Sequence, residues 1–490
     1  MLRKLLFACF FIASFSHAQF NEGAPWMESL KKSNSATAKT SDQPLSLYTI
    51  SEAFHQYWEG KDYSKKGSGY KPYMRWENFW SYQVDENGFL PSPNDLWNTW
   101  KNKQNSTLKN NPTSSWTSLG PFSAGIFPGR LPGQGRVNAV AVDPNDENTW
   151  YVGAPAGGIW KSTDAGASWV NLFDNFLQIG VSGIAIDPND SDTIYIATGD
   201  DDAGDSFGIG VFKSTDGGST WNETGLNPGN STVNTRMNEI VIDPTNSNII
   251  WVGTSSGLRK STNGGDSFTS VRSGNIRDFK LKPGDPNTVY AVSSSSYFKT
   301  EDGGATFPQI TSILPASSGR LVLGVSPADP EVVYVLSANT GADDFSYQGL
   351  FKSIDGGDTF TETSNTVDIF ESSQAWFDLA LEVAPDDENE LYIGCLNIWR
   401  SSNGGNSFTR LNQWFRNDAA YSHADIHTLK FFNDKLFCGS DGGIYVSEND
   451  GASFTDFTTN GIAISQFYSC LLYTSPSPRD RTRSRMPSSA

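Results

Sequence analysis

The chain has 490 residues, with 36 Lys and Arg against 54 Asp and Glu, and a formal net charge of −18. Such an acidic chain excludes nucleic acid and anionic membrane surfaces as expected partners. The 46 Gly and 24 Pro give the turn density of an all-β protein.

The chain begins with the pattern of a secretory signal peptide. Two basic residues precede an apolar run over residues 5–15, and a small-x-small cleavage site ends at Ala18. The run is too short to cross a bilayer as a helix. We therefore expect residues 1–18 to be removed, no transmembrane segment, and a protein that is secreted or held at the outer cell surface.

Residues 19–115 are predicted to form a partly helical N-terminal region. Thr49 and Glu52 make a capping box, and apolar residues at helical spacing follow until Gly60. Shorter helices are predicted over 72–82 and 93–100. The aromatic residues of these helices fit either a small core or a carbohydrate platform, and their helical spacing favours the core.

Seven copies of one short motif fill the rest of the chain: Ser or Thr, any residue, Asp or Asn, any residue, Gly, two more residues, then Trp or Phe. Successive copies are 39 to 53 residues apart, and strand-like segments separate them. This period predicts an all-β fold, a β-propeller over residues 116–469 with about seven or more four-stranded blades. The acidic or amide positions are Asp164, Asp216, Asn263, Asp302, Asp355, Asn403 and Asn449.

The motif is interpreted as a structural turn. An Asp or Asn oxygen can accept backbone N–H groups, Gly permits a positive φ, and the aromatic residue enters the apolar layer between sheets. Asn replaces Asp in three copies, and an amide cannot act as a general acid. We therefore do not expect these positions to be catalytic.

Residues 470–490 differ from the preceding chain. They are rich in Ser, Pro and Arg, and they resemble a translated sequencing adapter. We expect natural sequence to continue beyond Ser469, so that seven blades are a lower bound. Cys395 and Cys438 occupy equivalent strands of neighbouring repeats, where either a disulfide or two buried thiols would fit.

The repeats resemble the Asp-box (BNR) repeats of sialidases, of the sortilin (VPS10) receptor domain, of family 74 glycoside hydrolases and of photosystem II assembly-factor propellers. The strongest resemblance is to secreted proteins of the Bacteroidota. It is carried by Trp116–Pro121, Gly135–Asn138 and Ala154–Lys161. Proteins of that kind commonly end in a sorting domain for type IX secretion, which the resemblance implies for the natural protein.

The resemblance supplies one catalytic candidate. Family 74 enzymes carry an Asp in an Asp-x-Gly-Gly turn, and the first unit here has Pro155 at that position. A later turn has Asp441, displaced by one residue. Because glycoside hydrolysis usually needs two carboxyl groups, a single candidate weakens the prediction of an enzyme.

Four arginines near the starts of inner strands are candidates for ligand binding, since sialidases use an arginine triad and guanidinium groups bind carboxylates well. The alternative is that they are structural and salt-bridged. They are Arg136, Arg236, Arg277 and Arg320.

Two clusters are candidates for binding calcium or another divalent metal, although no cofactor is required by the sequence. In the first, strand alternation would place an imidazole, a carboxylate and a second imidazole on one face; its members are His423, Asp425 and His427. The second is an acidic loop that offers oxygen ligands; its members are Asp200, Asp201, Asp202 and Asp205. A polar ladder at the channel rim and a solvated loop are the alternatives.

Two functions follow from these observations. The first is a secreted or cell-surface propeller that binds an extracellular protein or a carbohydrate. The second is a glycoside hydrolase of the family 74 xyloglucanase kind, or less readily a sialidase. The single acid candidate favours binding over catalysis.

Overall fold

A computed structural model describes residues 24–27, 30, 45–63, 69–91, 93–105, 122, 131–155, 157–173, 180–202, 208–227, 235–311, 314–315, 317–340, 345–416 and 418–465. The chain divides into two compact units, residues 1–112 and 113–490, and each is described by itself. The predicted signal peptide, the predicted adapter tail and Asp205 lie outside the described residues. Among the described residues, no helix is both long enough and apolar enough to span a membrane.

The first unit is helical. Its described elements are η1 (Pro25–Met27), α2 (Leu47–Trp58), α3 (Tyr70–Trp80) and α4 (Pro93–Asn105). The cap of α2 is Ser46, whose hydroxyl accepts a hydrogen bond from Thr49 N at 3.2 Å, so this helix starts before the predicted capping box. Trp26, Phe54 and Tyr73 are buried together, and the rings of Phe54 and Tyr73 stack 3.7 Å apart.

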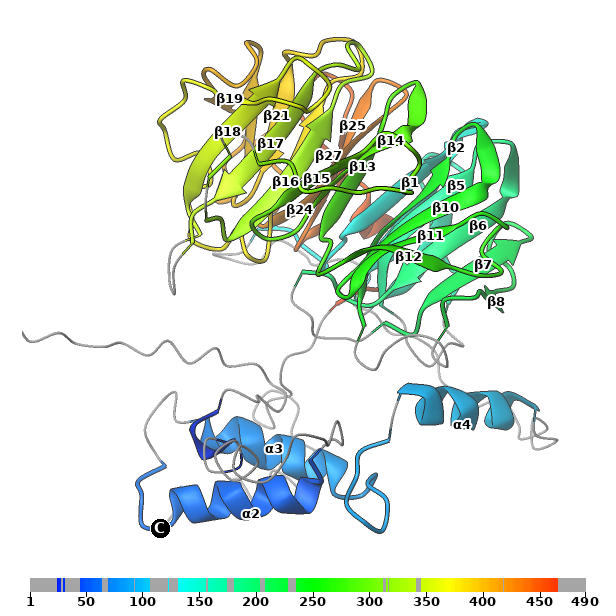
Figure 1. Cartoon of the computed structure of the whole chain (residues 1–490), viewed down its shortest axis with the longest axis vertical. Helices are drawn as coiled ribbons and strands as arrows, with labels where there is room; N and C mark the ends of the chain where they lie inside the picture. Colours follow the sequence, from blue (N-terminus) through cyan, green and yellow to red (C-terminus); the bar gives the residue numbers. More distant parts are fainter. Residues whose placement is uncertain are drawn as a thin grey trace, which may run out of the picture. The chain divides into compact units, whose positions relative to one another are not determined.

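The second unit contains a seven-bladed β-propeller (Figure 1). Blade 1 has β1 (Ala139–Asp143), β2 (Asp146–Ala154), β3 (Gly158–Ser162) and β4 (Val170–Asn171). Blade 2 has β5 (Val181–Asp187), β6 (Asp190–Thr198), β7 (Val211–Thr215) and β8 (Asn222–Glu223). Blade 3 has β9 (Met237–Asp243), β10 (Asn246–Thr254), β11 (Gly257–Ser261) and β12 (Thr269–Ser273). Blade 4 has β13 (Asp278–Lys282), β14 (Asp285–Val292) and β15 (Tyr297–Thr300).

The remaining blades follow in chain order. Blade 5 has β16 (Arg320–Val325), β17 (Val333–Ala338), β18 (Tyr347–Ser353) and β19 (Thr361–Glu362). Blade 6 has β20 (Ala380–Val383), β21 (Leu391–Gly394), β22 (Ile398–Ser401) and β23 (Thr409–Arg410). Blade 7 has β24 (Ile426–Phe432), β25 (Lys435–Ser440), β26 (Gly443–Ser447) and β27 (Thr455–Asp456), and η3 (Thr458–Asn460) comes after it.

Each blade is an antiparallel sheet whose strands pair in chain order. The prediction of four-stranded blades is confirmed for six of the seven sheets in the described part of the chain. Blade 4 has three strands there, and an isolated bridge between Phe298 and Gln309 takes the place of its fourth. Cys395 and Cys438 are both buried and unpaired, so these two thiols form no disulfide.

The ring closes where blade 7 meets blade 1. Val137 N donates to Ser440 O at 3.0 Å, and Asn460 Nδ2 donates to Gly166 O at 2.8 Å. The segment after η3 packs its Ile462 into the apolar core of blade 1. The seventh blade thus contacts the first directly. Seven is therefore the complete number for this ring, and the expectation that it was only a lower bound is corrected on this point.

The motif forms the turn between the third and fourth strands. In the first copy, Asp164 Oδ1 accepts Ser168 N at 2.8 Å, and the Ser168 hydroxyl donates to Asp164 Oδ2 at 2.6 Å. In the third copy the direction reverses, since Asn263 Nδ2 donates to the Ser267 hydroxyl at 3.0 Å. A hydroxyl can donate or accept, so either Asp or Asn completes the turn.

Lysines that directly precede several of the motifs link neighbouring blades. Lys260 Nζ lies 4.7 Å from the ring centre of Trp251 and donates to Gly303 O, in the turn of the next blade, at 2.6 Å. Lys161 repeats this arrangement with Gly217 O at 3.0 Å. These lysines combine a cation–π contact with a hydrogen bond across the blade interface.

Candidate functional site

The inner strands of all seven blades, β1, β5, β9, β13, β16, β20 and β24, line a central cavity of about 660 Å³. Arg277, Arg320 and His427 lie at the end where the inner strands begin, which we call the upper face. Pro144 and Pro188 lie at the opposite end, in the turns that follow β1 and β5, which we call the turn face. The cavity therefore runs along the propeller axis.

The acidic loop that follows β6 lies at the upper end of this cavity and neutralises arginines from other blades. Arg136 Nη1 donates to Asp200 Oδ1 at 3.1 Å, and both side chains are buried. Arg320 Nη2 donates to Asp202 Oδ1, also at 3.1 Å. The arginines and the acidic loop, which were predicted as separate sites, are partners of one another. Buried charges need such pairing and hydrogen bonding.

The other two predicted arginines are less fully paired. Arg277 Nη2 lies 3.9 Å from Asp202 Oδ1 and donates to Asp201 O at 3.3 Å. Arg236 is half-buried, and its Nε has no hydrogen-bond partner among the described residues. Arg136 therefore fits the alternative of a structural, salt-bridged arginine, and Arg236 fits it less well.

His427 joins the acidic loop to blade 7. Its Nδ1 is 2.7 Å from Asp202 Oδ2, and its Nε2 is 2.9 Å from Asp441 Oδ1. Burial alone would lower the pKa of His427, but Asp202 and Asp441 outweigh it and raise this pKa to about 10. The ring is therefore a charged donor to both carboxylates. Arg136 Nε also lies 3.6 Å from Asp441 Oδ1.

The predicted alternation of His423, Asp425 and His427 does not hold. Strand β24 begins at Ile426, and Asp425 has a φ of 62°, so Asp425 is not in extended conformation and the alternation is broken there. Asp425 Oδ1 accepts Gln374 Nε2 at 2.5 Å, whereas His427 contacts Asp202. No three His, Cys, Asp or Glu side chains in the described ranges are arranged to hold a metal ion. Metal binding stays a prediction for both clusters.

A loop before β20, which sequence reasoning did not identify, completes the upper end. Arg320 Nη1 donates to Phe377 O at 3.1 Å. The Phe377 ring lies 4.8 Å from the Arg136 guanidinium and 4.7 Å from the His427 ring. The next residue, Asp378, is fully buried, and burial raises its pKa to about 8.

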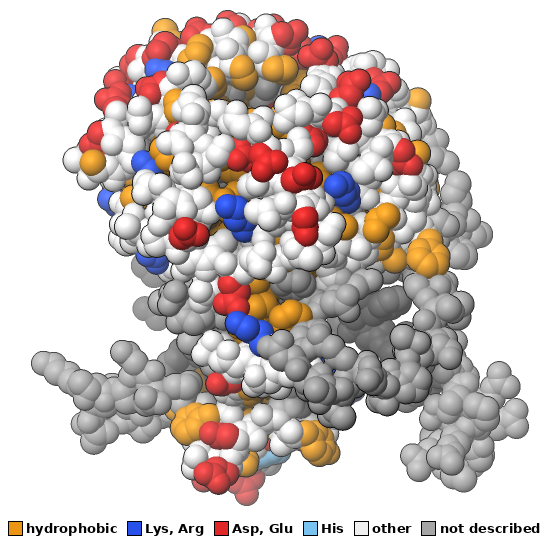
Figure 2. All heavy atoms as spheres, turned by 90° about the vertical axis from the view of Figure 1, so that its right-hand side faces the viewer, with side chains coloured by type: hydrophobic (Ala, Val, Ile, Leu, Met, Phe, Trp, Pro, Cys, Tyr) orange, Lys and Arg blue, Asp and Glu red, His pale blue; other side chains and the backbone are white. Residues whose placement is uncertain are grey.

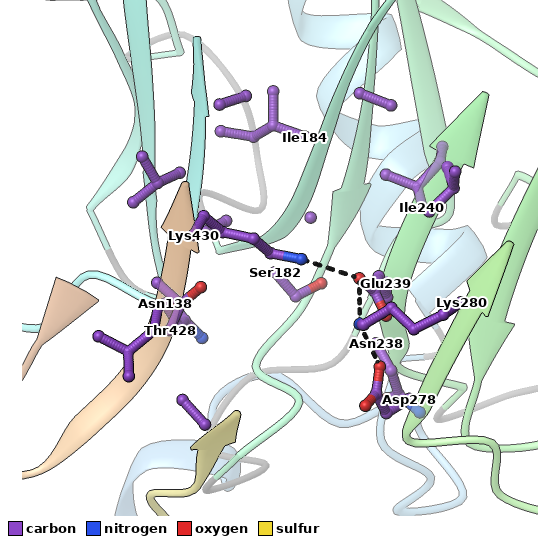
Figure 3. A pocket seen from close by; sticks show the side chains of 18 of the residues that line it. Asn138, Ser182, Ile184, Asn238, Glu239, Ile240, Asp278, Lys280, Thr428 and Lys430 are labelled. Carbon is purple, nitrogen blue, oxygen red and sulfur yellow. Dashed lines mark hydrogen bonds and ion pairs between the residues drawn. The ribbon is translucent and has the colours of Figure 1, made fainter. Parts of the chain in front are cut away.

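Charged side chains also project into the middle of the channel (Figure 3). Lys280 Nζ is 2.5 Å from Asp278 Oδ1 and 3.3 Å from Glu239 Oε1. Lys430 Nζ is 3.6 Å from the same Glu239 oxygen. Burial raises the pKa of Asp278 to about 6 against the opposing effect of Lys280. For Glu239, the two lysines overcome burial and lower the pKa to about 2.

An exposed aromatic pair lies on the upper face, in the loop between β23 and β24. Trp414 and Phe415 have 44% and 59% of their surfaces exposed, and their ring centres are 5.8 Å apart. Trp414 N donates to Asn397 Oδ1 at 3.0 Å. Asn397 Nδ2 in turn donates to Glu371 Oε2 at 2.7 Å, and Arg410 pairs with Glu371. A chain of polar contacts that starts at the buried Asn397 therefore holds the loop. Neither aromatic residue belongs to the repeat, so sequence reasoning missed both.

No family model matches the chain. A xyloglucanase of Paenibacillus sp is 36% identical over 75 residues, which are 15% of this chain and 7% of that protein. A xyloglucanase of Hypocrea jecorina is 47% identical over 57 residues, which are 11% of this chain and 6% of that protein. The matched segments thus span less than a tenth of the length of each of these curated relatives.

Solved structures match over a longer range. A GH74 enzyme of Niastella koreensis has a TM-score of 0.51 and 22% identity, over 67% of this chain and 55% of that one. The GH74 xyloglucanase of Xanthomonas campestris has a TM-score of 0.50 and 18% identity, over 66% of this chain and 53% of that one. This chain has the propeller fold of these enzymes. It spans about half the length of these enzymes. At this level of identity, the similarity establishes the fold and no shared activity.

Proposed function

We propose that this protein is a secreted propeller that binds a glycan on its upper face, over Trp414 and Phe415, and does not hydrolyse it. Aromatic rings offer a flat apolar surface at low conformational cost, which suits the apolar face of a sugar ring. Contiguous exposed apolar surface marks interaction sites on soluble proteins, and the two rings contact each other edge to face. This aromatic pair is the observation that carries the proposal.

The support beneath the pair strengthens this proposal. Asn397 is 2% exposed, and both ends of its side-chain amide are used, one by Trp414 N and one by Glu371. A loop that is held in this way loses little freedom when a ligand binds, which favours affinity.

The carboxyl groups of the upper face argue against hydrolysis. A glycosidase needs a protonated acid and a second carboxylate, both within reach of the substrate. Asp441 is paired with the charged His427 and with Arg136, so its carboxylate is engaged in two ion pairs. Asp378 has the raised pKa of an acid but is 0% exposed. The ion pairs of Asp441 and the burial of Asp378 therefore disfavour these two carboxyl groups as the general acid.

The relatives suggest the first ligand to test. Two curated proteins with local similarity are named xyloglucanase, so xyloglucan oligosaccharides are the first probes. Calorimetric titration should detect binding by the full chain, and Trp414→Ala should weaken it about tenfold or more. Ile354→Ala is the matched control, because Ile354 is 75% exposed but lies in a motif turn away from the upper face.

Glycoside hydrolysis remains the second candidate, and the names of the same relatives are what favours it. A reducing-sugar assay on the titrated samples separates the two functions. Unchanged oligosaccharide supports the binding module, and shortened oligosaccharide supports the enzyme.

A further inference from the structure

We propose that the aromatic pair of Trp414 and Phe415 binds a single neutral pyranose unit, at a branch or a chain end, and does not bind an extended stretch of polysaccharide backbone. The inference rests on the proposed glycan function, and it narrows the class of ligand that the same site accepts.

The angle between the two rings is the first observation. The ring planes of Trp414 and Phe415 meet at 89°, and the ring centres are 5.8 Å apart. A polysaccharide backbone lies flat on several aromatic rings at once when their faces point the same way, whereas perpendicular rings cannot both lie flat against one chain. A single sugar ring can stack on one of these rings while the other ring contacts its edge. The pair is therefore shaped for one unit.

The backbone keeps the two rings close together. Arg416 N donates to Gln413 O at 2.9 Å, so Trp414 and Phe415 are the central residues of a four-residue turn. Asn397 Oδ1 fixes this turn by accepting Trp414 N. Neither ring lines the central cavity. The turn thus presents one compact contact point, and the rings cannot separate into a longer platform.

The blades offer no second exposed stacking position in the described part of residues 131–465. Besides the pair, the large apolar side chains that are exposed there are Val170, Ile354 and Val367, and none of them is aromatic. A backbone that binds along its length needs a row of contact points, because each stacked unit adds only a modest part of the binding free energy. Over these blades it would find one such point.

The charges near the pair indicate a neutral sugar. Arg416 Nε lies 3.3 Å from Asp418 Oδ2, and Arg410 is paired with Glu371. Each of these two cations thus has its own acidic partner, and the local charge is balanced. The whole chain has a net charge of −18, and Asp and Glu are spread over the surface seen in Figure 2. Such a surface repels an acidic sugar.

The Arg416–Asp418 pair also offers polar contacts beside Phe415. Its two side chains are 58% and 43% exposed, and their contact uses Nε of the guanidinium. Guanidinium N–H groups donate and carboxylate oxygens accept, so the pair can bind neighbouring hydroxyl groups of one sugar. A unit at a branch or a chain end keeps free the hydroxyl groups that an internal unit uses in its linkages. These contacts therefore favour a terminal unit.

The length of the ligand tests the proposal, with the full chain and ligand-observed NMR titration. The branched probes are the disaccharide xylosyl-α-1,6-glucose and a xyloglucan heptasaccharide with three such branches, and the unbranched probes are cellotetraose and cellohexaose. A one-unit site gives the heptasaccharide at most about three times the association constant of the disaccharide, because only the number of equivalent branches differs. It gives cellotetraose and cellohexaose equal constants.

The possible failures are distinguishable. A larger rise with length in either series would overturn the proposal and leave a glycan-binding function in place. Absence of binding by every probe would contradict the proposed function itself, and with it this inference. Methyl glucoside and methyl glucuronide compare the neutral and acidic forms of one unit, and tighter binding of the glucuronide would rule out a site for neutral sugars.

Phe415→Ala separates a one-unit site from a platform. Loss of the edge contact should weaken binding of the disaccharide and of the heptasaccharide by the same factor, about fivefold or more. Val170→Ala is the control and should change neither constant, because Val170 is an apolar side chain that is 63% exposed in β4 of blade 1. Unchanged affinity in Phe415→Ala, or a greater loss for the heptasaccharide than for the disaccharide, would refute the one-unit site.

Discussion

His427 Nε2 lies 2.9 Å from Asp441 Oδ1, and this contact ties the turn after β25 to the start of β24. The same ring contacts Asp202 through Nδ1, so one imidazolium connects blade 7 to the loop of blade 2. Asp441 was the catalytic candidate from the family resemblance. Its position beside a buried cation instead suits a structural partner.

Asp441→Asn tests this interpretation. The change removes one of the two carboxylates that hold the charge on His427, so we expect the free energy of unfolding at pH 7 to fall by about 1–3 kcal/mol. Glycan affinity should not change, because Trp414 and its support are untouched. Denaturant unfolding and calorimetric titration measure the two quantities. Unchanged stability with a loss of glycan hydrolysis would instead make Asp441 catalytic.

Asp378→Asn tests the buried carboxyl of the upper end. The pKa of Asp378 is about 8 in the folded state and about 3.9 in an unfolded chain. The folded state thus binds the extra proton between these values. The stability that this proton supplies is fully present below about pH 4 and is lost as the pH rises to 8.

The variant has no such proton to lose. Its stability relative to the natural protein should therefore increase with pH, by up to about 1.4 kcal/mol per pH unit between about pH 5 and 8. Denaturant unfolding at several pH values measures the difference. Asp386→Asn, at an exposed position, should show no such trend. Parallel stability curves for Asp378→Asn and the natural protein would rule out the raised pKa.

The blades could be predicted because the turn motif is local. Its hydrogen bonds span four residues, as between Asp164 and Ser168, so a short pattern contains all the chemistry that the turn needs. The prediction of seven or more blades came from the same pattern. Closure of the ring at seven depends on contacts such as Asn460 with Gly166, 294 residues apart, which no local pattern contains.

The site could be predicted only in part. Arg136 and Asp200 were each identified from the sequence, but as members of different sites, because 64 residues separate them and the ring brings them together. Lys280 and Glu239 were missed since they occupy the middle of inner strands, where apolar residues are usual. Trp414 was missed because its importance comes from its exposure and from the Asn397 contact, which are properties of the folded loop.

Ala165→Gly tests the geometry of the turn. Ala165 has a φ of 53°, and the equivalent Gly217 and Gly264 both have a φ of 66°. A side chain in this region is strained by roughly 1–2 kcal/mol, and removing it costs about 0.4–1 kcal/mol through the unfolded state. We expect a net gain of about 0.5–1 kcal/mol in the free energy of unfolding. The control Ala141→Gly, in β1, should lower stability, and a loss at both positions would contradict the turn assignment.

The binding of xyloglucan oligosaccharides by the natural protein and by Trp414→Ala, with analysis of the sugar after titration, tests the central proposal most directly. We predict binding by the natural protein, an affinity about tenfold or more lower for Trp414→Ala, and oligosaccharide that is recovered intact. Equal affinities for the two proteins, or shortened oligosaccharide, would contradict a glycan-binding upper face without hydrolysis.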